Sequence, residues 1–231
     1  MVIVTGDTHR DFDRIFDFCE ECGTTKEDIM VILGDAGINY YLDESDYELK
    51  QELSLLPVTL LCIHGNHEER PEEICSYEEL PWHDGIVYAE PEFPTLLFAK
   101  DGEIYDLDGK QTLVIGGAYS VDKFMRLSGG APWFSTEQPD DEIKRRTEAR
   151  LEQAGWRVDC VFSHTVPLRY MPRHAFLPGI DQSMVDNSTE EWLDTIERRL
   201  KYGRWYAGHF HIDSYEGPIR IVQDDFLEIC N

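Results

Sequence analysis

The sequence predicts an α/β fold in which a parallel sheet is followed by a second, antiparallel or mixed one. In the first half of the chain, short apolar runs alternate with polar segments of helical periodicity, and the connections between them are short. This alternation predicts parallel strands joined by right-handed crossovers. From residue 85 to 117 the strands follow one another without helices, which is typical of antiparallel pairing. With 231 residues and 42% apolar content, we expect a single domain spanning residues 1–231.

The individual elements follow from the apolar runs, because a short run bounded by Gly or polar residues indicates a buried strand. Strands are predicted at 1–5, 29–33, 58–63, 86–89, 95–99, 103–107, 112–115, 158–162 and 204–207, with further short ones over about 212–230. Helices are predicted at about 11–22, 44–55, 70–76, 140–154 and 189–201. Asp108-Gly109 predicts a hairpin turn. We expect the polar and aromatic stretch 117–141 to be a long loop that walls the functional site.

The chain is strongly acidic, with a formal net charge of -25. Binding to a nucleic-acid backbone relies on Lys and Arg displacing counterions, so this charge disfavours nucleic acid as a partner. No stretch reaches the roughly twenty apolar residues that span a bilayer, and we expect no membrane association. The sequence does not predict an oligomeric state.

The cysteines indicate a reduced, cytoplasmic protein. Cys62 and Cys160 lie inside apolar runs, where a thiol packs as a small hydrophobe. The chain also begins with a predicted strand rather than a signal segment. Cys19 and Cys22 have the spacing of a redox or zinc pair, but no second pair follows, so we expect no function for them. The six cysteines are Cys19, Cys22, Cys62, Cys75, Cys160 and Cys230.

Five short pieces of sequence carry metal-binding side chains, and each follows a predicted strand. They are Asp7-Thr8-His9, Gly34-Asp35, Gly65-Asn66-His67-Glu68, His164, and Gly208-His209-Phe210-His211. The carboxyl ends of parallel strands share one edge of a sheet, so we expect these pieces to converge. Their mixture of oxygen and nitrogen ligands suits Mn, Fe, Zn, Co or Ni better than Mg or Ca. The sequence therefore predicts a paired-metal hydrolase.

In this order, the five pieces resemble the calcineurin-like metallophosphoesterase superfamily, and within it the bacterial and phage-type phosphoesterase branch. The resemblance runs from residue 6 to residue 211. It implies a four-layer α/β/β/α sandwich with two mixed β-sheets flanked by helices. It also implies a dinuclear centre of Mn or Fe, with Zn, Co or Ni as alternatives, at the carboxyl ends of the central strands.

The resemblance also implies a role for each residue of the centre. One ion would take Asp7, His9, Asp35 and His211, and the other would take Asp35, Asn66, His164 and His209. His67 is not expected to bind metal but to act near the leaving group or the phosphoryl oxygens. The implied reaction is attack on phosphorus by a hydroxide that bridges the two ions, with Asp35 and His67 as catalytic residues.

The expected substrate is a small soluble phosphodiester or phosphomonoester. Protein Ser/Thr phosphatases of this superfamily carry phosphate-binding arginines after the second piece and before the third, but residues 34–40 and 64–68 contain none. We expect Asn66, Arg126 and Arg10 to contact the substrate. For Arg126, the alternative is a surface salt bridge to Asp122.

Several alternatives remain open at this point. The protein could be a Ser/Thr-type protein phosphatase, a nuclease, or a non-catalytic metal-binding interaction module on the same fold. His64 could contact a ligand or pack at its strand end. Trp133 and Phe134 could stack on a nucleobase or close the 117–141 segment onto the body of the protein.

Overall fold

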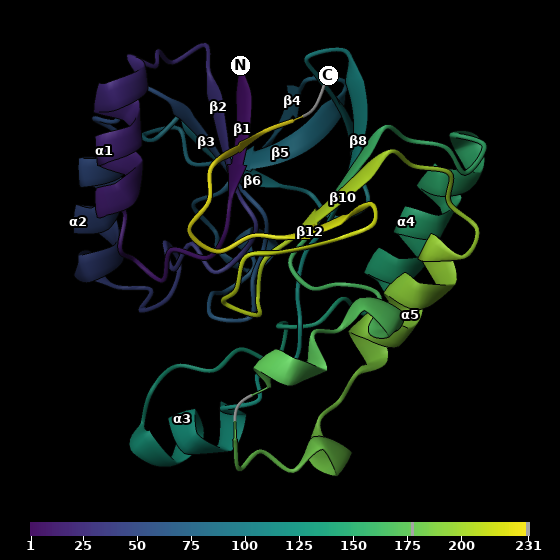
Figure 1. Cartoon of the computed structure of the whole chain (residues 1–231). Coiled ribbons are helices and arrows are strands. Elements are labelled where there is room, and N and C mark those ends of the chain that lie inside the picture. The colour runs from purple at the N-terminus through teal and green to yellow at the C-terminus, as the bar shows by residue number, and fades with distance from the viewer. Residues whose placement is uncertain (177, 230–231) are drawn as a thin grey trace.

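Two sheets lie face to face at the centre of the molecule, and helices cover both outer faces (Figure 1). The computed structural model describes residues 1–176 and 178–229. Helices α1 (Asp13–Cys22) and α2 (Glu44–Leu53) cover one side, and α4 (Asp141–Gln153) and α5 (Ser188–Glu197) cover the other. This arrangement confirms the expected four-layer α/β/β/α sandwich.

The first sheet contains the parallel strands of the amino-terminal half. Its order is β13-β1-β2-β3-β6-β5-β4. Strands β1, β2, β3 and β6 are parallel, whereas β13, β5 and β4 join antiparallel at the edges. The bounds are β1 Val2–Thr5, β2 Ile29–Ile32, β3 Thr59–Cys62, β4 Glu78–Trp82, β5 Gly85–Ala89, β6 Leu96–Ala99 and β13 Leu227–Glu228.

The second sheet is also mixed, with the order β11-β12-β10-β9-β8-β7. Strands β8, β9, β10 and β12 are parallel, and β7 and β11 pair antiparallel at the two edges. The bounds are β7 Ile104–Leu107, β8 Lys110–Ile115, β9 Cys160–Ser163, β10 Arg204–Ala207, β11 Ser214–Glu216 and β12 Ile219–Ile221. The predicted turn at Asp108-Gly109 is confirmed: it joins β7 to β8, and both residues have positive φ, 50° and 73°.

The structure corrects four details of the sequence prediction. The strands β5 and β6 belong to the first sheet rather than the second, because β6 pairs with β3. Strand β4 was not predicted, since this exposed edge strand has no apolar run. The predicted loop 117–141 contains a short helix, α3 (Lys123–Gly129), and the predicted helix 70–76 is a single 3₁₀ turn at Pro71–Glu73.

The remaining segments of the chain are short. Further 3₁₀ turns occur at Leu168–Tyr170, Arg173–Ala175 and Gln182–Met184.

Cys19, Cys22, Cys62 and Cys75 are free thiols, and Cys230, at the end of the last predicted strand region, lies outside the described residues. In the part of the chain that the structure describes, no helix has the length and apolar character needed to cross a membrane.

The central strands are buried on both faces, which explains why their sequences are continuous apolar runs. Val4 and Val31 pack with Phe162 of the second sheet in the core between the sheets. Their neighbours Ile3 and Met30 pack in the layer that contains α1 and α2. The central strands are therefore held on two sides, and their carboxyl ends form a rigid base for the loops that follow.

Tyr105 of β7 connects the two sheets through its hydroxyl group. The ring is buried, the hydroxyl donates to the carbonyl of Ile86, and it accepts from the amide of Lys100 at 2.9 Å. Ile86 lies in β5, and Lys100 directly follows β6, so one side chain of the second sheet pairs with two backbone groups of the first.

We predict that Tyr105→Phe lowers the free energy of unfolding by about 1–3 kcal/mol, because the two backbone groups lose this partner in a dry environment. Urea denaturation at equilibrium measures the change. Tyr41→Phe, at a tyrosine that is 51% exposed, is the control and should leave stability nearly unchanged. Equal stability of the two variants would contradict the assigned role of Tyr105.

Candidate metal centre

The five motif pieces converge at one end of the two sheets. Asp7 and His9 follow β1, Asp35 follows β2 and Asn66 follows β3. His164 follows β9, and His209 and His211 follow β10 in the facing sheet. The backbone here is unusual, since His9, Asp35, His209 and His211 all have positive φ, between 46° and 69°. Non-glycine residues rarely adopt this conformation, and such strain tends to concentrate at functional sites.

Two buried carboxylates are held by backbone amides of other pieces. Asp35 Oδ1 accepts from the amide of His67 at 2.7 Å, and Asp7 Oδ1 accepts from the amide of His209 at 2.9 Å. Both approaches require glycine: a Cβ on Gly65 would lie 2.0 Å from Asp35 Oδ1, and one on Gly208 would lie 2.2 Å from Asp7 Oδ1. The second oxygen, Oδ2, of each aspartate faces the imidazole rings.

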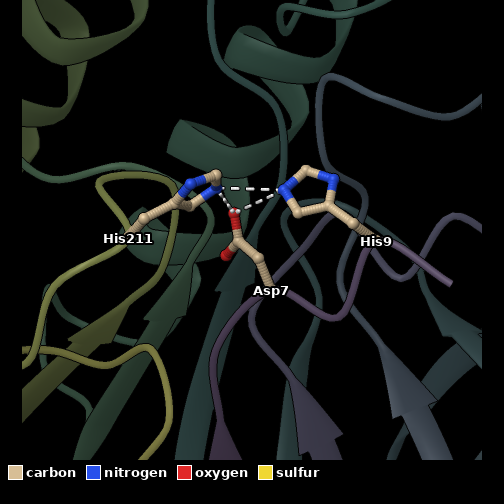
Figure 2. A group of neighbouring side chains, drawn as sticks. All are labelled: Asp7, His9 and His211. Atoms are coloured by element: carbon tan, nitrogen blue, oxygen red, sulfur yellow. Dashed lines mark hydrogen bonds and ion pairs between the residues drawn. The ribbon is translucent and has the colours of Figure 1, made fainter. Parts of the chain in front are cut away.

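Asp7, His9 and His211 form the first group of converging atoms (Figure 2). The Nε2 atoms of His9 and His211 are 3.0 Å apart, and they lie 3.8 and 3.2 Å from Asp7 Oδ2. Asp7 Oδ2 is buried, and it faces these two imidazole nitrogens. Three atoms that can each offer a lone pair therefore point at one place, and this arrangement suits a cation.

The second group contains Asp35, Asn66 and His164. The Nδ1 atom of His164 lies 2.8 Å from the carbonyl oxygen of Leu33, which can only accept, so Nδ1 carries the proton and Nε2 of the neutral ring keeps its lone pair. The Nδ2 atom of Asn66 donates to Ser120 Oγ at 3.0 Å, which turns its Oδ1 toward His164 Nε2, 2.8 Å away. Two acceptors that face each other at this distance fit a shared cation.

Two buried carboxylates connect the two groups, since Asp7 also offers an atom within 4.8 Å of Asp35 and His164. Asp35 Oδ2 lies 3.8 Å from His9 Nε2 in the first group and 3.6 Å from His164 Nε2 in the second. Burial favours the neutral acid, yet the surrounding imidazoles and the hydrogen bond from the His67 amide outweigh it and keep the pKa of Asp35 well below its usual value. Asp35 is therefore ionised and placed between the two groups.

The remaining histidines of the pieces border these groups. The rings of His209 and His164 are 5.0 Å apart, and neither group of converging atoms includes His209. Burial lowers the pKa of His209 to about 3, so its ring is neutral and can act as a ligand. His67 lies outside both groups, 3.9 Å from Asp122 Oδ1, and burial also lowers its pKa.

A cavity of about 340 Å³ opens onto both groups. His67 and Asn66 line it beside the ligand candidates, and the 117–141 segment walls it with Tyr119, Val121, Asp122 and Met125. Trp133 does not line this cavity; its Nε1 donates to Glu137 at 2.8 Å, which closes the segment on itself. Phe134 and His64 are buried away from the cavity, as expected for packing residues.

The two arginines expected to contact substrate lie elsewhere. Arg10 pairs with Asp46 and donates to the carbonyls of Gly37 and Ser45, so both terminal nitrogens are engaged at the start of α2. Arg10 does not line the cavity, and its expected contact with the substrate stays a prediction. The ion pair considered for Arg126 is present, with its Nη1 atom 3.8 Å from Asp122 Oδ1, although the Arg126 side chain is buried rather than at the surface.

Arg126 instead lies behind the second group. Its Nη1 donates to Ser120 Oγ at 3.3 Å, and Ser120 in turn accepts from Asn66. Arg126 is not among the residues that line the cavity, and its expected contact with the substrate stays a prediction. Ser120 Oγ therefore connects Arg126 to Asn66.

Sequence reasoning missed two buried glutamates. Glu68 accepts from the amides of Gly37 at 3.1 Å and Gly65 at 3.2 Å, which joins the loop after β2 to the loop after β3. Its place in Gly-Asn-His-Glu was the available signal. Glu190 of α5 accepts from Thr165 Oγ1 at 2.8 Å and lines the cavity, and burial raises its pKa to about 7. Nothing distinguishes Glu190 from its acidic neighbours in the sequence.

Comparison with known proteins agrees with this geometry. The family model for calcineurin-like phosphoesterases matches residues 1–213. The chain belongs to the calcineurin-like phosphoesterase family. Membership in this family implies metal-dependent hydrolysis of phosphoesters in general, and calcineurin-like phosphoesterases typically bind divalent metals, for which both groups of converging atoms are candidates.

Solved structures show the same fold. The chain is similar to the protein TT1561 of Thermus thermophilus, with 12% identity over 96% of this chain and 87% of that one and a TM-score of 0.54. A second solved structure is 14% identical over 96% of this chain and 89% of the other, with a TM-score of 0.50. At these identities the likeness concerns the fold alone. A comparison with curated proteins finds no match.

We predict that Glu68→Gln weakens Mn²⁺ binding about tenfold, because an amide cannot accept both backbone N–H groups and the loops that carry Asp35 and Asn66 are no longer joined. Calorimetric titration of the metal-free protein measures the affinity. Glu73→Gln, at an exposed glutamate nearby, is the control. Unchanged affinity in Glu68→Gln, with its circular dichroism intact, would contradict this role.

We predict that Glu190 makes metal-free protein less stable as the pH rises from about 4.5 to about 7. Its pKa is about 7 when folded against an ordinary 4.5, so the unfolded chain loses this proton first and stability falls through that window, by about 3 kcal/mol at most. Buried His209 contributes the opposite slope from its lowered pKa, and this contribution is present with or without Glu190.

The difference between wild type and Glu190→Gln therefore isolates Glu190. Urea denaturation at several pH values should show the variant gaining stability relative to wild type as the pH rises to about 7. Parallel pH profiles for the two proteins would refute this assignment.

Proposed function

We propose that the protein is a dinuclear metal-dependent phosphoesterase that hydrolyses phosphodiester or phosphomonoester bonds of small soluble substrates. The observation that carries this proposal is the pair of donor groups that share Asp35 Oδ2 and open onto one cavity. Two metal ions, when bound, activate water for in-line attack on phosphorus and stabilise the developing charge.

In this proposal the chain's own residues hold the two ions. Asp7, His9 and His211 would hold one, Asn66, His164 and His209 the other, and Asp35 would reach both through Oδ2. Nitrogen and oxygen ligands of this kind support Mn or Fe, with Zn, Co or Ni as alternatives. The amides of His67 and His209 fix the two aspartates before any ion arrives, so the site is preorganised.

His67 has a separate part in the proposed reaction. It lines the cavity, lies outside both donor groups, and has its Nε2 atom 3.9 Å from Asp122 Oδ1. We assign it the proton transfer at the leaving-group oxygen. Its backbone amide also holds Asp35, so the residue that handles the proton is connected to the residue between the two ions.

The cavity supports a small substrate over a macromolecular one. Its volume of about 340 Å³ is at the lower end of the range of about 300–1,000 Å³ for small-molecule sites. No Arg or Lys of the described residues lines it, which argues against the arginine-based phosphate recognition of protein phosphatases. The net charge of -25 argues against a nuclease. The complete donor set argues against a non-catalytic module.

We predict that the purified protein with Mn²⁺ hydrolyses bis-p-nitrophenyl phosphate, p-nitrophenyl phosphate or both. His67→Ala should lower kcat by about 10²–10⁴-fold at unchanged metal content, the usual contribution of a positioned proton donor. Asp35→Asn should lose both activity and bound metal. His83→Ala, at an exposed histidine, is the control.

Metal content and activity are measured on the same samples, with Mn, Fe, Zn, Co and Ni tried in turn. No turnover of any phosphoester with any of these metals would overturn the proposal. A fully active His67→Ala variant would remove His67 from the mechanism while leaving the metal centre in place.

A further inference from the structure

The cavity extends well beyond the donor groups into an apolar arm. This arm lies between residues 119–125 on one side and residues 171–176 and 178–187 on the other, and these segments lie at one end of the molecule (Figure 1). Its apolar lining includes Met125, Met171, Phe176, Ile180, Val185 and Phe210. Hydrolysis of a phosphoester bond requires only the donor groups and His67, so the arm is available to bind the organic part of the substrate.

Two aromatic side chains of the arm favour a flat ligand. The rings of Phe176 and Phe210 are nearly parallel, with an angle of 15° between their planes and 6.4 Å between their centroids. Phe210 lies in the chain between His209 and His211, so a group in contact with this ring is beside the metal-binding end of the cavity. Flat aromatic rings pack favourably against such side chains.

The arm also holds polar groups that suit the edge of a ring. Gln182 and Asn187 line it with amide side chains, and Glu190 lines it with a carboxyl group on a residue that is 3% exposed. Glu190 Oε2 has no hydrogen-bond partner within the described residues. The amide groups of Gln182 and Asn187 can form hydrogen bonds with the polar edge of a ring, which an alkyl chain does not offer.

The same lining excludes other classes of ester. Because none of the described Lys and Arg side chains lines the cavity, a second phosphate or a carboxylate on the substrate would have no cationic partner outside the metal-binding end. A sugar phosphate that carries no aromatic ring would place its hydroxyl groups against Met and Phe side chains. The lining therefore favours a substrate with one phosphoryl group and one flat, weakly polar organic group.

We propose that this apolar arm selects phosphoesters whose organic group contains a flat aromatic ring. This inference rests on the proposed phosphoesterase function and names its substrate class. An aryl or arylmethyl ester and a nucleobase-bearing ester share this chemistry, and the experiment below distinguishes them.

The test compares substrates that are matched in leaving group. Benzyl phosphate is compared with butyl phosphate, and adenosine 5′-monophosphate with ribose 5-phosphate, each as the monoester and as its methyl diester, with Mn²⁺ present. We expect the ring-bearing member of at least one pair to have a kcat/KM about tenfold higher or more, the scale of one aromatic stacking contact. A preference confined to the benzyl pair indicates an aryl ester, and one confined to the adenosine pair indicates a nucleobase.

The matched variants are Phe176→Ala and Phe124→Ala, the second at a phenylalanine that is 66% exposed on α3. Phe176→Ala should raise KM for the preferred ring-bearing ester about tenfold, the scale of a lost base–aromatic contact, and leave kcat and the ring-free ester unchanged. Phe124→Ala should change neither. Phe176→Leu, which keeps the bulk but not the flat face, guards against a folding defect.

A binding measurement separates this inference from the proposed function. Saturation-transfer NMR on metal-free protein should show contact with benzylphosphonate or adenosine but not with butylphosphonate, and Phe176→Ala should remove it. Phosphoester turnover without preference in either pair and without an effect of Phe176→Ala would overturn the inference and leave the proposed function standing. Ring binding without any turnover would support the arm and overturn the proposed function.

Discussion

The centre depends on hydrogen bonds from backbone amides to two buried carboxylates. The amide of His67 holds Asp35 and the amide of His209 holds Asp7, so each aspartate at the end of one strand is fixed by the loop that follows another. A backbone amide that donates to a carboxylate favours the charged form of the carboxylate and also fixes the orientation of the side chain. One oxygen of each aspartate is thereby used for structure, and the other is left to face the imidazole nitrogens.

This constraint explains the rest of the local sequence. Glycine is required at positions 65 and 208 because the carboxylates approach the backbone too closely for a Cβ. The positive φ of Asp35 and His209 is the conformational cost of turning sharply at a strand end, and packing of both sheets against helices offsets it. Glu68 then joins the two loops that carry Asp35 and Asn66. The packed sheets thus support the strained backbone of the loops at their carboxyl ends.

The central strands and the metal-binding residues at their ends could be predicted from the sequence, because both are indicated by short local sequence patterns. A buried central strand such as Ile29–Ile32 is apolar throughout, and metal-binding residues directly after it must lie at its carboxyl end. Edge strand β4 has no such signal, because Glu78 and Glu79 face solvent. Likewise, the sequence of β5 and β6 indicates a hairpin but not the sheet to which the hairpin is added.

Long side chains were predicted least well. Arg10 and Arg126 both lie near motif pieces, but one reaches α2 and the other reaches Ser120, and the direction of a guanidinium is decided by tertiary contacts. The most direct test of the account is anomalous diffraction from crystals grown with Mn²⁺. It predicts two peaks, one beside Asp7, His9 and His211 and one beside Asn66 and His164, with Asp35 Oδ2 contacting both ions. A single peak, or two peaks that do not share Asp35, would contradict it.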